Sequence, residues 1–182
     1  MVTTLVLISL LLQATAPKIP ENAVFQAELK KEITTRRSKA GQNIQLVVSS
    51  AVAGSDGAVV IPVGAKLSGK IVTVTKRSKD DPATLSIVVD KAEWKDGSAT
   101  LNAVVQQLQG VASSAEAGNC GPNLNRGGMG ACGGASVNLQ PPPADCTVAN
   151  SAITCSKHEL ELGPGTLFVM RNVAAKTPGG GN

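Results

Sequence analysis

The sequence predicts an all-β fold, either a small β-barrel or a β-sandwich, with a disulfide-stapled glycine-rich loop. Short segments in which apolar and polar residues alternate recur between residues 24 and 109, and turn-forming residues separate them. Residues 56–72 show this most clearly, because an Asp-Gly turn, a buried β-branched run at 59–61, a Pro-x-Gly turn and a second apolar run follow one another. With 182 residues, the chain is long enough to bury one core.

Residues 1–16 are predicted to be a signal peptide. Residues 5–12 are almost wholly apolar, and Ala14-Thr15-Ala16 has the small-x-small form of a cleavage site, so the mature chain would begin near Pro17. No basic residue precedes the apolar run, and a buried N-terminal strand or short helix is the alternative. We expect no transmembrane span after removal of the signal, and we expect the protein in the periplasm or outside the cell.

Residues 17–109 are expected to form the main β-domain. Alternation predicts a first strand from Phe25 to Ile33, another after Gly41, and a hairpin over residues 85–105 that turns at Asp96-Gly97. The positions expected to face the core are Phe25, Ala27, Leu29 and Ile33; Ile44, Leu46 and Val48; Leu85, Ile87 and Val89; and Ala99, Leu101, Ala103 and Val105.

Residues 110–145 are expected to form a loop insertion, because glycine, asparagine, serine, alanine and proline replace the alternating pattern there. Residues 146–174 are expected to supply the closing strands of the β-domain, with turns at 149–151 and 163–165. Residues 175–182 are rich in glycine and are expected to be a disordered tail.

The four cysteines are expected to form disulfides, since an even number in an exported chain is typical of cross-linked proteins. They are Cys120, Cys132, Cys146 and Cys155. Three pairings exist, and we favour Cys146 with Cys155, because a hairpin that turns near Asn150 would place them opposite each other. Cys120 and Cys132 would then close the glycine-rich loop. A zinc site that also uses His158 is the weaker alternative, because no Cys-x-x-Cys spacing occurs.

Two glycine motifs in the loop match known signatures without their structural context. Residues 128–133 have the letters of a dinucleotide-binding fingerprint, and residues 130–134 have those of a nucleophile elbow with Cys132 as nucleophile. Neither has the flanking strand and helix that such sites require, so we predict a glycine loop and no cofactor. A thiol-dependent enzyme that uses Cys132, with His158 as its base, is kept as an alternative. Otherwise His158 is expected to face solvent on a strand.

Three carboxylates, Asp90, Glu93 and Asp96, cluster around Trp94 near the predicted hairpin turn. Acidic residues at a turn are more often a solvated rim than an acid–base pair, so we expect no catalytic role for them. Trp94 is expected to pack at the end of a strand.

The composition argues against nucleic-acid binding, and one basic stretch is a candidate partner-binding strand. The net charge is only +4, and the chain has two Phe, one Trp and no Tyr, which argues against the stacking platforms of single-strand binding proteins. The densest basic stretch is predicted to lie on a strand that faces anionic lipid, cell-wall polymer or an envelope protein. Its residues are Lys30, Lys31, Arg36, Arg37 and Lys39. A solvated strand edge kept soluble by lysines is the alternative.

Several segments resemble a family of small exported β-proteins of unknown function from Gram-negative bacteria. The resemblance covers residues 19–105 and 160–171. It rests on residues 40–42, 90–92, 95–98 and 163–167 and on residues 60–69, which contain the element Ile61-Pro62-x-Gly64-x-x-Leu67-x-Gly69. This element is also similar to the β-barrel domain of TrbI-type conjugation and type IV secretion proteins, which assemble into an envelope-spanning channel. The resemblance implies a β-domain of the cell envelope.

We therefore expect an exported, non-enzymatic binding or scaffolding domain of the cell envelope. An exposed strand edge near residues 23–33 is expected to pair with a strand of a protein partner. A component of a TrbI-like secretion or conjugation channel, and a thiol-dependent enzyme, are the alternative functions.

Overall fold

The computed structural model describes residues 19–112 and 139–174. The predicted signal peptide, most of the glycine-rich loop with Cys120 and Cys132, and the predicted tail lie outside the described residues. Every regular element within the described residues is a strand, as the sequence predicts. The strands are β1 (Val24–Leu29), β2 (Ile33–Thr34), β3 (Asn43–Val48), β4 (Val52–Ala53), β5 (Val59–Ile61), β6 (Lys66–Thr75), β7 (Ala83–Trp94), β8 (Gly97–Ala112), β9 (Leu139–Gln140), β10 (Cys146–Ala149), β11 (Ala152–Cys155), β12 (Glu161–Leu162) and β13 (Leu167–Asn172).

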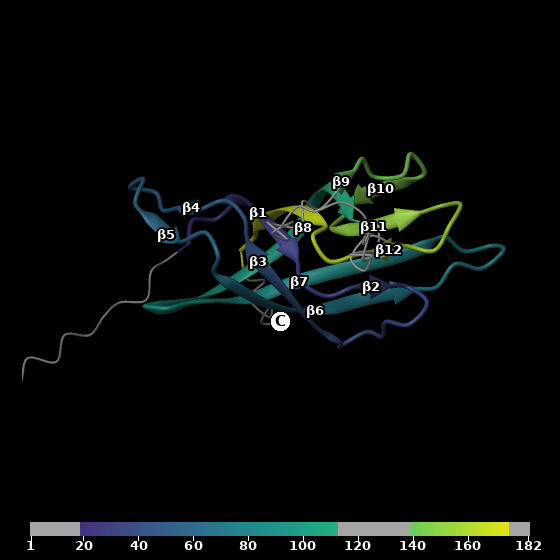
Figure 1. Cartoon of the computed structure of the whole chain (residues 1–182), viewed down its shortest axis with the longest axis horizontal. Helices are drawn as coiled ribbons and strands as arrows, with labels where there is room; N and C mark the ends of the chain where they lie inside the picture. The colour runs from purple at the N-terminus through teal and green to yellow at the C-terminus, as the bar shows by residue number, and fades with distance from the viewer. Residues whose placement is uncertain (1–18, 113–138, 175–182) are drawn as a thin grey trace, which may run out of the picture.

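Six of these strands form a closed antiparallel barrel (Figure 1). Going round the barrel, β1 pairs with β3, β3 with β6, β6 with β7, β7 with β8, and β8 with β13, which returns to β1. The last strand of the chain therefore lies between the first strand and β8. The barrel is the correct one of the two predicted architectures. Beyond its pairing with β8, β7 carries the β10–β11 hairpin on the same edge.

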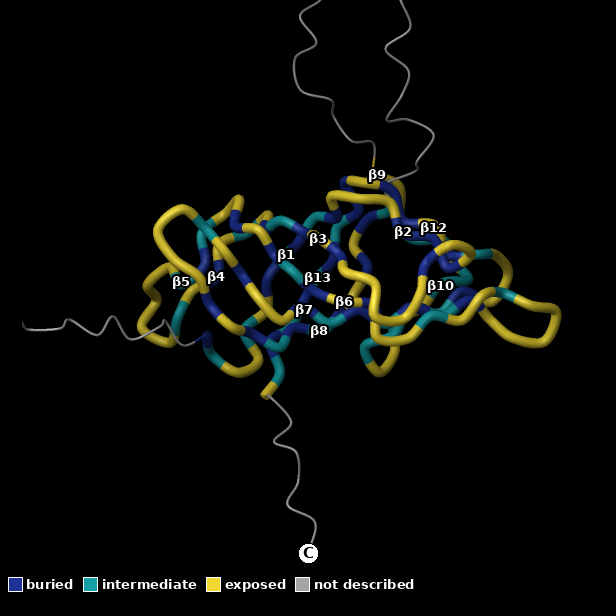
Figure 2. The backbone as a smooth tube through the Cα atoms, turned by 90° about the horizontal axis from the view of Figure 1, so that it is seen from below, coloured by how far each residue is buried: buried dark blue, intermediate teal, exposed yellow. Residues whose placement is uncertain are grey.

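The alternating sequence pattern forms the wall of the barrel because successive side chains of a strand point to opposite faces. The positions predicted to face the core in the strands at 25–33, 44–48, 85–89 and 99–105 are all buried. Phe25 on β1 and Phe168 on β13 are the two phenylalanines of the chain, and both are almost wholly buried. Buried and exposed positions alternate along the strands in Figure 2. Hydrophobic burial inside the barrel is therefore the main force that holds this fold together.

Two small sheets lie outside the barrel wall and extend the core toward opposite ends of the molecule (Figure 1). One is β2 with β12, in which Ile33 pairs with Leu162. The other is β4 with β5, in which Val52 pairs with Ile61. All four of these side chains are at most 2% exposed, so each small sheet contributes to the single core.

Two strand predictions are wrong in detail because of these small sheets. The predicted strand from Phe25 to Ile33 is split, since β1 ends at Leu29 and Ile33 leaves the barrel wall to pair with β12. In the predicted buried strand 59–61 only Ile61 is buried, and Val59 is 61% exposed. The reason is that β5 pairs only with β4, outside the barrel.

The expected free edge near residues 23–33 is also wrong. Strand β1 pairs with β13 along one edge and with β3 along the other, so its backbone groups are already used. A partner strand cannot add to β1 without opening the barrel.

Candidate binding site

The favoured disulfide is confirmed. Cys146 and Cys155 are directly opposite each other in the β10–β11 hairpin, with Cα atoms 4.1 Å apart and a bond between their sulfur atoms. The hairpin turns at Asn150 and Ser151, whose positive φ angles of 50° and 64° are those of a type I′ turn. The described disulfide therefore staples this hairpin rather than the glycine-rich loop. Cys132, the predicted nucleophile of the alternative enzyme, lies outside the described residues.

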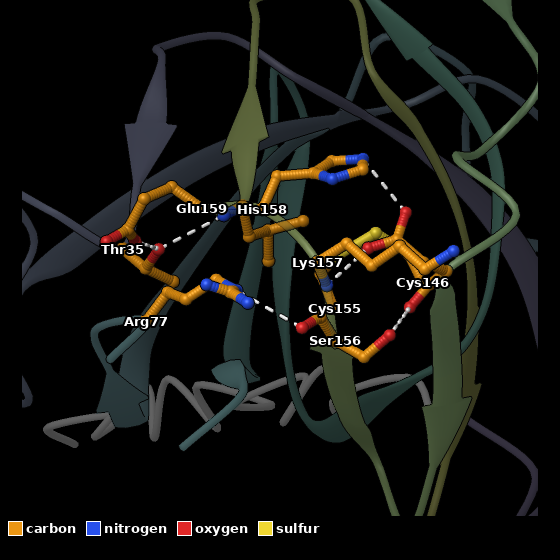
Figure 3. The surroundings of a disulfide bond; sticks show 10 residues. Thr35, Arg77, Cys146, Cys155, Ser156, Lys157, His158 and Glu159 are labelled. Atoms are coloured by element: carbon orange, nitrogen blue, oxygen red, sulfur yellow. Dashed lines mark hydrogen bonds and ion pairs between the residues drawn. A yellow bond between two sulfur atoms is a disulfide. The ribbon is translucent and has the colours of Figure 1, made fainter. Parts of the chain in front are cut away.

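His158 lies in the connection after β11, not on a strand as predicted. Its ring contacts Asp145, and the two form an ion pair when the imidazole is protonated (Figure 3). Its Nε2 is 2.9 Å from Asp145 Oδ1, and the other carboxylate oxygen accepts a hydrogen bond of 2.8 Å from the backbone N–H of Lys157. Burial opposes ionisation of Asp145, but the hydrogen bond from Lys157 and the charge of His158 lower the pKa of Asp145 below its ordinary value. This arrangement fixes the chain as it leaves the hairpin.

Asp145→Asn is expected to lower the free energy of unfolding near neutral pH and to lose this effect in acid. A carboxylate with a lowered folded-state pKa stabilises the protein fully above its unfolded-state pKa, about 3.9, and the contribution disappears as the pH falls through the lower folded-state value. Urea unfolding at pH 6 and at pH 2.5 measures the difference. The exposed Asp80→Asn serves as the control, and an equal effect of the two variants at pH 6 would refute the role of Asp145.

The predicted basic strand is a basic loop. All five of its cationic residues are exposed, but they lie in the connection from β1 to β3 rather than on a barrel strand. They are Lys30, Lys31, Arg36, Arg37 and Lys39. Lys30 pairs with Glu28 at 2.7 Å, so part of this charge is already neutralised.

Trp94 and its neighbours lie at the other end of the barrel, at the tip of the β7–β8 hairpin. Trp94 is the last residue of β7 and pairs with Gly97, the first residue of β8, so the hairpin loop is Lys95-Asp96. The indole covers Gly97 closely, since a Cβ added there would lie 3.1 Å from the ring. Glycine at this position therefore allows the indole to lie across the hairpin. Trp94 packs on the core as expected, but it stays partly exposed.

The three carboxylates near Trp94 differ in their ion pairing. Glu93 forms an ion pair with Lys91 at 2.6 Å, and the hydrogen bond and charge of Lys91 lower the pKa of Glu93. Asp90 and Asp96 are exposed, as predicted for a solvated rim. Of the three, Glu93 and Asp96 share a hollow with Trp94.

Two open hollows flank Trp94, and they share Pro62, Trp94 and Asp96 as walls. We call the two hollows together the Trp94 groove. The first has a volume of about 570 Å³ and is lined by Pro62, Val63, Gly64, Ala65, Lys66, Glu93, Trp94, Lys95 and Asp96. The second has about 610 Å³ and is lined by Gly54, Ser55, Asp56, Ala58, Val59, Val60, Pro62, Trp94 and Asp96. Both volumes lie in the range of small-ligand sites.

The two hollows differ in charge. The first has Lys66 and Lys95 together with two carboxylates, so its charges balance. The second has the carboxylates of Asp56 and Asp96, and none of its lining residues is basic. Val59 in the second hollow and Val63 in the first are each 61% exposed. The groove therefore combines an indole, exposed apolar surface and local negative charge.

Comparison of the chain with protein-family models, curated proteins and solved structures finds no match. The resemblance to TrbI-type domains thus stays a prediction. Within residues 19–112 and 139–174, no group of three potential metal ligands comes together. The same residues contain no helix with the length and apolar character of a membrane span.

The sequence pointed to Trp94 and its carboxylates but not to the groove. The second wall comes from the β4–β5 arm, residues 52–61, which lies far from Trp94 in the chain. The only hint of this second wall in the sequence was the Asp56-Gly57 turn close to Val59, which the structure shows to be exposed. The alternating pattern alone indicated a buried strand there.

Proposed function

We propose that this protein is an exported, non-enzymatic binding domain of the cell envelope and that the Trp94 groove is its ligand site. The Cys146–Cys155 disulfide supports export, because such bonds persist mainly in oxidising compartments. The rigid barrel supports a binding role, because both walls of the groove are anchored to it through Trp94 and Ile61.

The ligand that best fits the groove is a basic peptide segment. The second hollow, with an indole, two carboxylates and no basic lining residue, is the observation that carries this proposal. A lysine or arginine side chain there gains attraction to Asp56 and Asp96 and a cation–π contact with Trp94. The charge-balanced first hollow, with exposed Val63, accommodates an apolar neighbour of that basic residue.

The basic loop serves a different partner. Its five exposed cations belong to the connection from β1 to β3 that contains β2. Strand β2 lies toward the end of the barrel opposite the β4–β5 arm (Figures 1 and 2). Contact with anionic lipid or cell-wall polymer through this loop leaves the Trp94 groove facing away from that surface. The basic loop thus binds an anionic partner and the Trp94 groove a cationic one, and the two partners do not compete for the same surface.

The proposal is tested by titration with a capped pentapeptide that contains two arginines. Trp94 is the only tryptophan and the chain has no tyrosine, so intrinsic fluorescence reports on the groove alone. We expect a saturable change in emission, and a glutamine version of the peptide should produce none. Asp56→Asn with Asp96→Asn should weaken binding about tenfold, because two close charges are lost.

Asp80→Asn is the matched control, because it removes one exposed carboxylate in the β6–β7 connection at the other end of the barrel. Its affinity for the arginine peptide should equal that of the wild type. Equal binding of both peptides, or equal weakening by Asp80→Asn, would overturn the assignment of the groove to basic ligands.

A further inference from the structure

A further, smaller hollow lies on the outside of the barrel, where the β10–β11 turn meets β8 and β13. Its volume is about 200 Å³, and its lining residues are Val104, Val105, Gln106, Val148, Asn150, Ser151 and Arg171. Asn150 and Ser151 are the two turn residues with positive φ, so the type I′ turn places them beside the barrel wall. None of these residues lines the Trp94 groove.

Among the described residues, Arg171 is the only charged one that lines this hollow, and its Nε has no hydrogen-bond partner there. Strand β13 buries Phe168, Met170 and Asn172 in the barrel, so Arg171 belongs to the alternate, outer set of positions. Its Nε is buried, yet it donates no hydrogen bond among the described residues, and the guanidinium forms no ion pair there. A buried donor of a charged group without an acceptor is costly, which points to an acceptor that arrives with a ligand.

The rest of the lining is uncharged and consists of three valines and three neutral polar residues. Gln106, Asn150 and Ser151 supply amide and hydroxyl groups, and no carboxylate lines the hollow. The site therefore has one positive charge, a set of neutral donors and no competing anion. In register, Arg171 pairs with Val24 and Val104, so its cross-strand neighbours are apolar and cannot accept a hydrogen bond through their side chains.

We propose that this hollow binds a single carboxylate group. A guanidinium presents planar pairs of N–H donors that match the two oxygens of a carboxylate. A single positive charge balances a monoanion but not a phosphate dianion. At about 200 Å³ the hollow holds the carboxylate and little more, so the remainder of the ligand lies outside it. The carboxylate belongs to a small free acid or to the end of a peptide chain.

The test is a titration of the intact protein with sodium acetate, followed through the Nε–Hε signals of arginine in proton–nitrogen correlation spectra at constant ionic strength. We expect a saturable shift of the Arg171 signal. The Arg77 signal is an internal control, because Arg77 Nε already donates to the Ser156 carbonyl at 3.1 Å. Arg171→Lys should weaken acetate binding at least tenfold while keeping the charge. Asn150→Gly, which retains the positive φ, should weaken it less.

Three further measurements decide the result. The first compares the affinity for acetate with that for a dipeptide whose N-terminus is capped and whose C-terminal carboxylate is free. Tighter binding of the dipeptide assigns the site to peptide ends, and equal affinity assigns it to small acids. Sodium chloride that shifts the Arg171 signal as acetate does would overturn the proposal, as would tighter binding of inorganic phosphate than of acetate. The wild-type titration decides these outcomes even if Arg171→Lys fails to fold.

Discussion

Replacing Gly69 by alanine is expected to destabilise the barrel by about 3 kcal/mol or more, at the upper end of the range for overpacked cores. An added Cβ at Gly69 would lie 2.3 Å from the backbone oxygen of Val88 and 2.9 Å from the Cα of Val89. These atoms belong to the main chain of β7, so no side-chain rotation relieves the overlap. The pairing of β6 with β7 has a register shift between Ser68 and Gly69, and only glycine permits the two strands to approach so closely there.

Urea denaturation measures this loss, and Lys70→Ala is the matched control. Lys70 is the next residue of β6 and is exposed, so its replacement should change the free energy of unfolding by less than about 0.5 kcal/mol. Because small domains are stable by roughly 5–15 kcal/mol, the Gly69→Ala protein should still fold at low temperature. A midpoint within error of the Lys70→Ala protein would show that the backbones of β6 and β7 are not in close contact at this position.

Asn172→Ala is expected to cost about 2–3 kcal/mol, since it leaves three backbone groups without this hydrogen-bond partner. The side chain is only 6% exposed. Its Oδ1 accepts a hydrogen bond of 3.0 Å from the Asn102 N–H, and its Nδ2 donates to the Pro20 carbonyl at 3.0 Å and to the Ile19 carbonyl at 3.5 Å. Asn172 thus joins β8 and β13 to the segment before β1. Chemical denaturation of the variant measures the loss.

Asn172→Asp separates these hydrogen bonds from simple packing. The new carboxylate has the size of the amide, but an ionised oxygen would face the carbonyls of Ile19 and Pro20, which repels it. The carboxyl group should therefore have a raised folded-state pKa, and the variant should regain stability relative to the wild type as the pH falls through that value. An Asp variant whose deficit does not change with pH would refute the assigned pairing of Nδ2 with the two carbonyls.

The sequence predicted the barrel wall well because one physical rule governs it. In β3, for example, Ile44, Leu46 and Val48 alternate with polar or less buried residues, and all three face the core. The same rule failed beyond Leu29. Ile33 has the spacing of the pattern, but Lys31 interrupts the alternation and the chain has left the wall by then. Which strands become neighbours, and hence a barrel rather than a sandwich, depends on pairings between distant segments that no local pattern records.

The candidate sites were less predictable, for a related reason. Trp94 and Asp96 stood out by residue type, but their hollow needs Asp56 and Val59 from another sheet. Arg171 carried no signal at all, because an arginine at an outer position of an alternating strand is ordinarily solvated. Arg171 differs from such a residue only because the neighbouring β10–β11 turn encloses it in a hollow. The Cys146–Cys155 pair was predictable because its partners are nine residues apart in one hairpin.

The placement of β13 between β1 and β8 sets the order in which this chain can complete its fold. A chain that emerges with its N-terminus first, from a ribosome or an export channel, has β1 present long before residues 167–172 follow. Until then the wall has a gap, and closing it joins the two ends of the domain at a high cost in loop entropy. The barrel can therefore close only after residues 167–172 have been made.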